Sequence, residues 1–176
     1  MPLSSNSART TLVLGGARSG KSRYAEELLA AHDGARTYIA TAEARDAEMA
    51  ARIAEHQARR GPGWRTVEQP LDLVGALEAH CGPKGAVLVD CLTLWLSNLV
   101  AASRDIAAET AGLTAALGRL PGRAVLVSNE VGLGIVPQST LGREFRDHAG
   151  RLNQAVAEVT DEAVFITAGL PFRLKP

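Results

Sequence analysis

The 176-residue chain carries 19 basic and 19 acidic residues. This balance disfavours nucleic acid and anionic membranes as its main partners, because both select basic proteins. The length suits one domain, residues 1–176, with a sizeable core. The first ten residues lack the apolar core of a signal peptide, no apolar run is long enough to cross a bilayer, and two isolated cysteines indicate neither a disulfide framework nor a metal site. We therefore expect a cytoplasmic protein.

Residues 15–22, GGARSGKS, match G-x-x-x-x-G-K-[ST], the pattern of a phosphate-binding P-loop. The context agrees, since residues 11–14 predict a short buried strand and residues 23–31 an amphipathic helix. In such a loop, backbone N–H groups and the positive end of the helix dipole converge on phosphate oxygens. Lys21, one of only three lysines, is expected to reach the β- and γ-phosphates, and the Ser22 hydroxyl to bind Mg²⁺.

Strand and helix patterns alternate along the rest of the chain. Strands are predicted at residues 36–40, 64–68, 86–90, 124–128 and 163–167. Helices are predicted at residues 44–60, 71–81, 92–102, 105–120 and 141–159, with a Gly- and Pro-containing loop at 129–140 and a short tail at 169–176. Such alternation is typical of an α/β protein with a mostly parallel sheet covered by helices on both faces. Ligands then bind beyond the carboxyl ends of the strands.

Two acidic residues end predicted strands and are candidates for residues that lie near the Mg²⁺ bound with the P-loop. Asp90 closes an apolar run, which is where P-loop proteins place an acid near Mg²⁺. Glu68, at the end of the preceding strand, is the second candidate. Alternatively, Asp90 only begins a turn, because many buried strands end in a turn aspartate. Glu68 would then be a charge exposed to solvent.

Basic side chains gather on one face of the predicted helix 44–60. An arc of about 100° on the helical wheel holds Arg45, Arg52, His56, Arg59 and Arg60. One interpretation is a solvated face, partly paired by glutamates four residues before Arg52 and Arg59. The other is a phosphate-facing stripe with a nucleophile, because an imidazole with an ordinary pKa of about 6.5 is largely neutral at pH 7 and can attack phosphorus.

A resemblance to a known family is carried by segments that follow one another over nearly the whole chain. They are GGARSGKSRYAE (15–26), YIATAEARDAEMAARIAEHQARR (38–60), WRTVEQP (64–70), VLVDCLTLWLSNL (87–99), VSNEVGLGIVP (127–137), LGREFRDHAGRLNQ (141–154) and GLP (169–171). In these segments the chain resembles the bifunctional adenosylcobinamide kinase / adenosylcobinamide-phosphate guanylyltransferase family of cobalamin biosynthesis. The resemblance implies a three-layer, RecA-like P-loop fold and a homo-oligomer, with a trimer expected. It implies ATP or GTP as phosphoryl donor to adenosylcobinamide, and then GMP transfer from GTP to adenosylcobinamide phosphate.

The resemblance also assigns roles to individual residues. The histidine that carries GMP falls on His56, within the segment R-I-x-x-H. Nucleotide contacts carry over to Gly15, Gly16, Ala17, Arg18, Ser19, Gly20, Lys21, Ser22, Ala40, Thr41, Ala42, Gln57, Ala58, Arg59, Arg60, Glu68 and Asp90. Ser22 and Asp90 are the expected Mg²⁺ ligands.

Other residues and other activities stay open at this point. The loop 129–137 is either a substrate contact or a structural connection. Arg151, Asn153 and Gln154 are expected on a helix surface, Trp64 and Trp95 in the core, and no role is assigned to His32, His80 or His148. The alternative functions are another small-molecule P-loop kinase and a non-enzymatic nucleotide-dependent switch.

Overall fold

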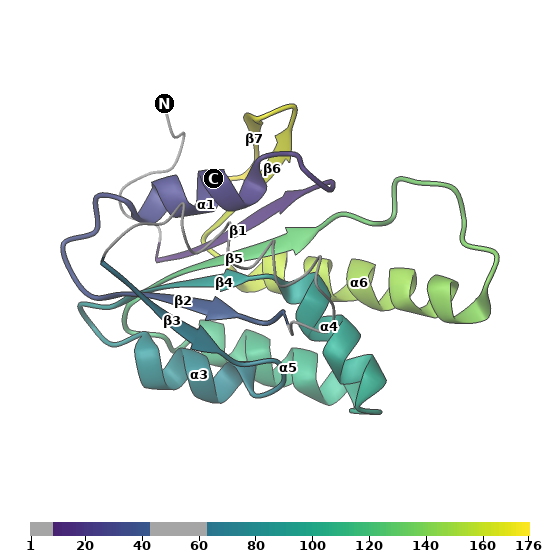
Figure 1. Cartoon of the computed structure of the whole chain (residues 1–176), viewed down its shortest axis with the longest axis horizontal. Coiled ribbons are helices and arrows are strands. Elements are labelled where there is room, and N and C mark those ends of the chain that lie inside the picture. Colours follow the sequence, from purple (N-terminus) through teal and green to yellow (C-terminus); the bar gives the residue numbers. More distant parts are fainter. Residues whose placement is uncertain (1–8, 43–62) are drawn as a thin grey trace.

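The computed structural model describes residues 9–42 and 63–176, which contain a seven-stranded sheet (Figure 1). The strands are β1 (Thr10–Gly15), β2 (Arg36–Ala40), β3 (Trp64–Glu68), β4 (Ala86–Asp90), β5 (Arg123–Asn129), β6 (Glu162–Thr167) and β7 (Leu170–Lys175). Their order in the sheet is β3-β2-β4-β5-β1-β6-β7. Neighbours from β3 to β6 are parallel, and β7 alone in this sheet is antiparallel. The predicted helix 44–60 lies outside the described residues.

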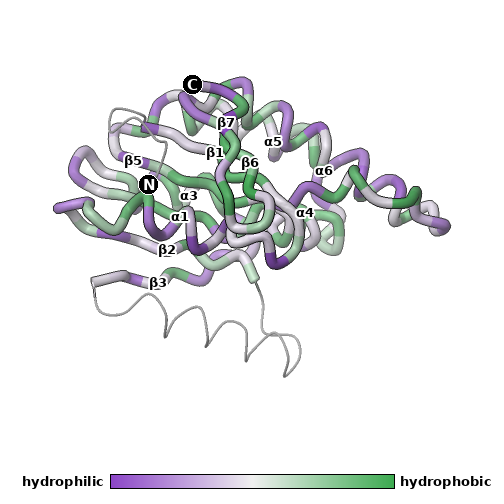
Figure 2. The backbone as a smooth tube through the Cα atoms, turned by 90° about the horizontal axis from the view of Figure 1, so that it is seen from above, coloured by the Kyte–Doolittle hydropathy of each residue, from purple (hydrophilic) through white to green (hydrophobic). Residues whose placement is uncertain are grey.

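Helices cover both faces of this sheet (Figure 1). They are α1 (Lys21–Leu29), α3 (Leu73–His80), α4 (Leu92–Ala101), α5 (Ile106–Leu117) and α6 (Thr140–Val159). Alternate residues of each central strand enter two separate cores, one with α1 and the other with α3, α4, α5 and α6. Because both faces are buried, the central strands are mostly apolar (Figure 2). The predicted three-layer α/β fold, a mostly parallel sheet with helices on both faces, is confirmed.

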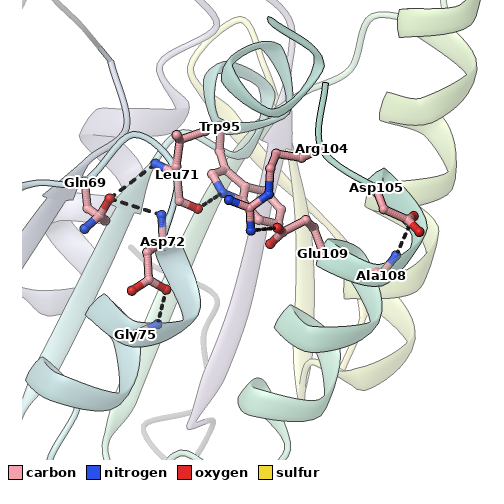
Figure 3. Close-up of polar contacts among 9 residues, drawn as sticks. All are labelled: Gln69, Leu71, Asp72, Gly75, Trp95, Arg104, Asp105, Ala108 and Glu109. Carbon is pink, nitrogen blue, oxygen red and sulfur yellow. Dashed lines mark hydrogen bonds and ion pairs between the residues drawn. The ribbon is translucent and has the colours of Figure 1, made fainter. Parts of the chain in front are cut away.

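Polar side chains cap α3 and α5, two helices of the larger core (Figure 3). Asp72 caps α3 by accepting a hydrogen bond from the Gly75 N–H at 2.9 Å, and Asp105 caps α5 in the same way. The indole of Trp95 is fully buried and donates to the Leu71 carbonyl at 2.8 Å, which confirms its predicted place in the core. These contacts hold the start of α3 against α4.

The prediction of a tail at residues 169–176 is wrong, because this segment forms the edge strand β7. A two-residue turn joins it to β6, and both turn residues have left-handed backbones, with φ of 51° at Ala168 and 77° at Gly169. That geometry suits the right-handed twist of a hairpin. Arg173 then reaches the buried Glu162 on β6 at 2.8 Å. The alternating sequence LPFRLK carried the signal for a strand.

Asp161 ties the start of β1 to the end of α6. Its Oδ2 accepts hydrogen bonds from the backbone N–H groups of Arg9 at 2.9 Å and Thr10 at 2.8 Å. Burial alone would raise the pKa of Asp161, but the hydrogen bonds from Thr10 and Arg9 outweigh it, so the pKa lies below its ordinary value. The ionised carboxylate is therefore the form that the fold prefers.

We expect Asp161→Asn to weaken the acid dependence of stability. A carboxylate with a lowered pKa stabilises the fold above the unfolded pKa of about 3.9, and this contribution is lost as the pH falls through the folded value. Urea unfolding at pH 7 and at steps below pH 4 measures the difference between variant and parent. The exposed Asp147 on α6 offers a matched control, Asp147→Asn, and an unchanged pH dependence in Asp161→Asn would refute the expectation.

Candidate functional site

The P-loop leaves β1 at the carboxyl edge of the sheet and enters α1. The backbone turns through left-handed conformations at Arg18, with φ of 55°, and at Gly20, with φ of 97°. The Lys21 ammonium donates to the Gly16 carbonyl at 3.0 Å, so the side chain folds back over the loop. No side chain caps α1 and no acid lies in its first turn, whereas Asp72, for example, caps α3. This arrangement suits an anion at the N-terminus of α1.

Close packing fixes the base of the loop. A Cβ on Gly15 would lie 2.5 Å from the Ser19 Oγ and 2.6 Å from the Ile166 carbonyl oxygen, so only glycine fits there. The Ser19 carbonyl accepts a hydrogen bond from the Gly169 N–H at 3.0 Å, which joins the loop to the β6–β7 turn. The Ser19 Oγ is buried and has no hydrogen-bond partner within residues 9–42 and 63–176. A buried hydroxyl of this kind fits a loop that binds an oxygen-rich ligand.

Three residues predicted from sequence share one row at the carboxyl edge. The parallel registers place Glu68 opposite Ala40, and Ala40 opposite Asp90. Asp90 accepts a hydrogen bond from the Tyr38 hydroxyl through Oδ2 at 2.8 Å. Tyr38 was not identified from the sequence as a partner of Asp90. A tyrosine on a buried strand, two residues before Ala40, indicates a hydroxyl that needs a hydrogen-bond partner.

Burial and two nearby charges act on Cys91, which follows Asp90. Burial raises the pKa of the Cys91 thiol to about 11, the charge of Asp90 also raises it, and hydrogen bonds from backbone N–H groups and the positive charge of Lys21 oppose them. Cys91 is therefore a neutral thiol and not a nucleophile at neutral pH. Cys91 shares a buried cluster with Tyr24 and Ala25 of α1, so the end of β4 and α1 lie close together.

The donor chemistry at this edge fits a magnesium ion that is bound together with phosphate. Within the described part of the chain, no group of three or more His, Cys, Asp or Glu side chains forms a metal site by itself. Ser22 and Asp90 bring a hydroxyl and a carboxylate oxygen. Mg²⁺ is usually held by one or two carboxylates and completes its shell with substrate phosphates and water.

The Thr41 hydroxyl serves the fold in this structure. Thr41 is fully buried, donates to the Cys91 carbonyl and accepts from the Cys91 N–H, both at 2.8 Å. The Asn98 amide donates to the Thr41 carbonyl at 2.8 Å. These bonds hold residues 40–42 beside Asp90. The Thr41 N–H donates to the Asp90 carbonyl at 3.2 Å, so the backbone of Thr41 also serves the fold.

Residues 11–174 match the family model described as cobinamide kinase / cobinamide phosphate guanyltransferase. The chain belongs to this family. The resemblance seen in the sequence is thus confirmed, and with it the bifunctional kinase and guanylyltransferase activity in cobalamin biosynthesis.

Curated relatives agree over nearly their whole length. The chain is 52% identical to the bifunctional adenosylcobalamin biosynthesis protein CobP of Pseudomonas aeruginosa, covering 93% of this chain and 96% of that one. It is 43% identical to the bifunctional adenosylcobalamin biosynthesis protein CobU of Escherichia coli, covering 93% and 98%.

Solved structures with lower similarity include the P4 protein of bacteriophage phi6 in complex with ADP, at 17% identity and a TM-score of 0.49, covering 94% of this chain and 54% of that one. The VirB11 ATPase of the Brucella suis type IV secretion system, in complex with sulphate, aligns at 14% identity and a TM-score of 0.49, covering 96% and 49%. The chain spans about half the length of each. Among the described residues of this family member, no helix has the length and apolar character needed to span a membrane.

The expected nucleotide contacts of this cobinamide kinase / guanyltransferase chain divide into two groups. The carboxyl edge brings together the P-loop residues 15–22, residues 40–42, Glu68 and Asp90. The other group, His56, Gln57, Ala58, Arg59 and Arg60, lies outside the described residues.

Asn153 of this cobinamide kinase / guanyltransferase chain was predicted on the helix surface, and this prediction is wrong. Asn153 is buried, accepts a hydrogen bond from the Ser128 hydroxyl at 2.7 Å and donates to the Asn129 carbonyl at 3.2 Å. The Asn129 N–H in turn donates to the Thr93 hydroxyl at 2.8 Å. This network fixes the end of β5 beside the P-loop. Helical periodicity indicates the buried position of Asn153, because the buried residues 149, 152 and 156 of α6 define a stripe that includes position 153.

We expect Asn153→Ala to lower the free energy of unfolding by about 2–3 kcal/mol, because the Ser128 hydroxyl keeps only its 3.3 Å contact with the Thr93 hydroxyl and the Asn129 carbonyl loses the Asn153 amide. Gln154→Ala is the matched control, since Gln154 is exposed on the same helix. Urea denaturation of both variants measures the difference. Equal stability of the two variants would show that the network contributes little.

Proposed function

We propose that this chain phosphorylates the aminopropanol hydroxyl of adenosylcobinamide with ATP or GTP, and then transfers GMP from GTP to give adenosylcobinamide-GDP. The observation that carries the proposal is that the P-loop and Asp90 lie at the same edge of the sheet, with α1 packed against β4, in a chain of this family. Both reactions start from a nucleoside triphosphate, so one triphosphate site is a shared requirement.

In the kinase reaction, the P-loop N–H groups hold the phosphates and Lys21 balances charge on the β- and γ-phosphates. The acceptor oxygen forms a bond to the γ-phosphorus while the bond to the β–γ bridging oxygen breaks, and the nucleoside diphosphate leaves. Ser22 and Asp90 are the proposed Mg²⁺ ligands, and the bound ion would neutralise charge that builds up on the phosphates. Tyr38, through its hydrogen bond, keeps the Asp90 carboxylate in place.

In the guanylyl reaction, the proposed nucleophile is His56. Its neutral imidazole attacks the α-phosphorus, and pyrophosphate leaves from the P-loop. A phosphate oxygen of adenosylcobinamide phosphate then attacks the same phosphorus, which releases His56 and completes the transfer. Arg59 and Arg60 are proposed to balance charge on the α-phosphate, and residues 40–42 and Glu68 to contact the nucleotide.

The two reactions demand attack at two different phosphorus atoms of a triphosphate held by one P-loop. A single rigid pose cannot present both atoms to their nucleophiles. We therefore propose that the segment with His56 repositions between the reactions, or that the nucleotide binds in two registers. Identical triphosphate and His56 positions in structures with GTP and with ATP would refute this.

We further propose that the chain acts as one domain in a homo-oligomer, with a trimer expected, and that it works in the cytoplasm without nucleic acid as a partner. Support for these statements comes from the balanced charge and from the family resemblance of the sequence.

Incubation of the protein with Mg²⁺ and α-labelled GTP tests the proposed function. We expect a covalent label that is labile to acid and stable to base, as a phosphorus–nitrogen bond would be, and that adenosylcobinamide phosphate removes. Phosphorylation of adenosylcobinamide without any label would indicate a small-molecule kinase alone. Neither activity would indicate a nucleotide-dependent switch.

A further inference from the structure

The segment after β5 begins beside the P-loop. The parallel register places Asn129 opposite Gly15, and the Glu130 N–H donates to the Gly15 carbonyl at 3.1 Å. Because β5 lies between β1 and β4, Glu130 follows the strand that separates the P-loop from Asp90. Of the acids Glu68, Asp90 and Glu130 at this edge, Glu130 follows the strand adjacent to β1.

The Glu130 carboxylate is held by its own loop. Its Oε1 accepts a hydrogen bond from the Gly132 N–H at 2.6 Å. A Cβ on Gly132 would lie 2.8 Å from that oxygen, so glycine lets the backbone approach the carboxylate closely. One carboxylate oxygen thus fixes the loop, and the other does not take part in this bond.

Large apolar side chains follow Glu130 on the same loop and are exposed. The exposed fractions are 81% for Leu133, 98% for Ile135 and 56% for Val136. In Figure 1 the green trace between β5 and α6 extends well beyond the end of the sheet. Exposed apolar groups clustered in this way indicate a surface that binds another molecule.

We propose that residues 130–136 bind the acceptor of the kinase reaction, which is a corrinoid with an apolar body and a hydroxyl-bearing side chain. This inference rests on the proposed function. Glu130 accepts the proton of the acceptor hydroxyl as the oxygen bonds to the γ-phosphorus, and the nucleoside diphosphate leaves with the bridging oxygen. Leu133, Ile135 and Val136 contact the apolar part of the acceptor. The loop begins beside the P-loop, so an acceptor bound to it would lie close to the γ-phosphate.

Two features favour Glu130 over the other acids at this edge. Asp90 already accepts a hydrogen bond from Tyr38 and is the proposed metal ligand. Glu68 ends β3, so β2, β4 and β5 lie between its strand and β1. A base for the acceptor must lie within hydrogen-bond reach of a hydroxyl that faces the γ-phosphate.

The first test is Glu130→Gln, which removes the basic charge but keeps a side-chain oxygen to accept from Gly132. We expect the kinase kcat for adenosylcobinamide to fall about 100-fold or more. The covalent GMP label should form as in the parent protein. The matched control is Glu144→Gln, an exposed glutamate near the start of α6, which should leave both activities unchanged. Unchanged kinase activity in Glu130→Gln, or an equal loss of kinase activity and label, would overturn the proposal.

The second test is the double substitution Leu133→Ser and Ile135→Ser. We expect the KM for adenosylcobinamide to rise about 10-fold or more, with the KM for nucleotide and the molecular mass in solution unchanged. Dissociation of an oligomer with an unchanged KM for adenosylcobinamide would assign this surface to a second copy of the chain and overturn the proposal. A parent protein with neither label nor kinase activity would instead refute the proposed function, so the two failures are distinguishable.

Discussion

Lys21→Ala should lower both activities of the enzyme, and the kinase kcat by about 10²–10³-fold, the scale expected when one preorganised donor to a developing charge is removed. Lys21 lies at the start of α1 and its ammonium already bends over the P-loop to the Gly16 carbonyl. It is the proposed contact of the β- and γ-phosphates, which are transferred or released in the two reactions. Initial rates of adenosylcobinamide phosphorylation and the yield of GMP label measure the two losses.

Lys84→Ala is the matched control for this experiment. Lys84 is exposed in the connection between α3 and β4, at the opposite edge of the sheet from the P-loop. Its substitution should leave both activities near those of the parent. Kinase activity that persists in Lys21→Ala would contradict the assignment of the P-loop, provided that urea unfolding shows a folded variant.

His56→Ala should remove the GMP label by at least about 10³-fold and leave phosphorylation of adenosylcobinamide close to the parent level, because loss of a nucleophile acts only on the step that it performs. The two substitutions therefore give different patterns, since Lys21→Ala lowers both reactions and His56→Ala lowers one. Label yield and kinase rate on the same preparation measure this split. The retained kinase activity also shows that the variant is folded.

His80→Ala is the control for the histidine experiment. His80 ends α3 and lies toward the amino edge of the sheet, away from the P-loop. Its substitution should leave the label intact. A label that survived His56→Ala would assign the nucleophile to another residue.

The central strands could be predicted from sequence because burial on both faces makes them mostly apolar, and residues 64–68 because they alternate like a short strand. Residues 36–40, 64–68 and 86–90 were predicted with the bounds that β2, β3 and β4 have in the structure. The P-loop helix begins at Lys21 and not at residue 23, since the last residues of the motif already form its first turn. Motif and position predicted the P-loop residues, Glu68 and Asp90 as nucleotide contacts, and the sheet register places them at the carboxyl ends of the strands. Their contacts with nucleotide stay predictions.

Other contributors to this edge could not be found from local patterns, because they depend on contacts between distant segments. The bond from Tyr38 to Asp90 joins two strands that are 52 residues apart in sequence. The bond from Ser128 to Asn153 requires α6 to lie against the end of β5. The outermost strand β7 was missed for another reason. Three of its apolar side chains, Leu170 among them, are exposed, whereas Arg173 and Lys175 bond to neighbouring segments of the fold.

The bond from Gly169 to Ser19 links the β6–β7 turn with the nucleotide loop, and it bears on how the protein can be engineered. A Cβ on Gly20 would lie 3.4 Å from the Gly169 Cα, so the turn also packs against the start of α1. Insertions, linkers or split points placed at residues 168–169 would disturb the P-loop and so weaken phosphate binding, although this hairpin turn lies at the periphery of the sheet. The exposed loop before α6 would be a safer position for a reporter in studies of nucleotide binding alone.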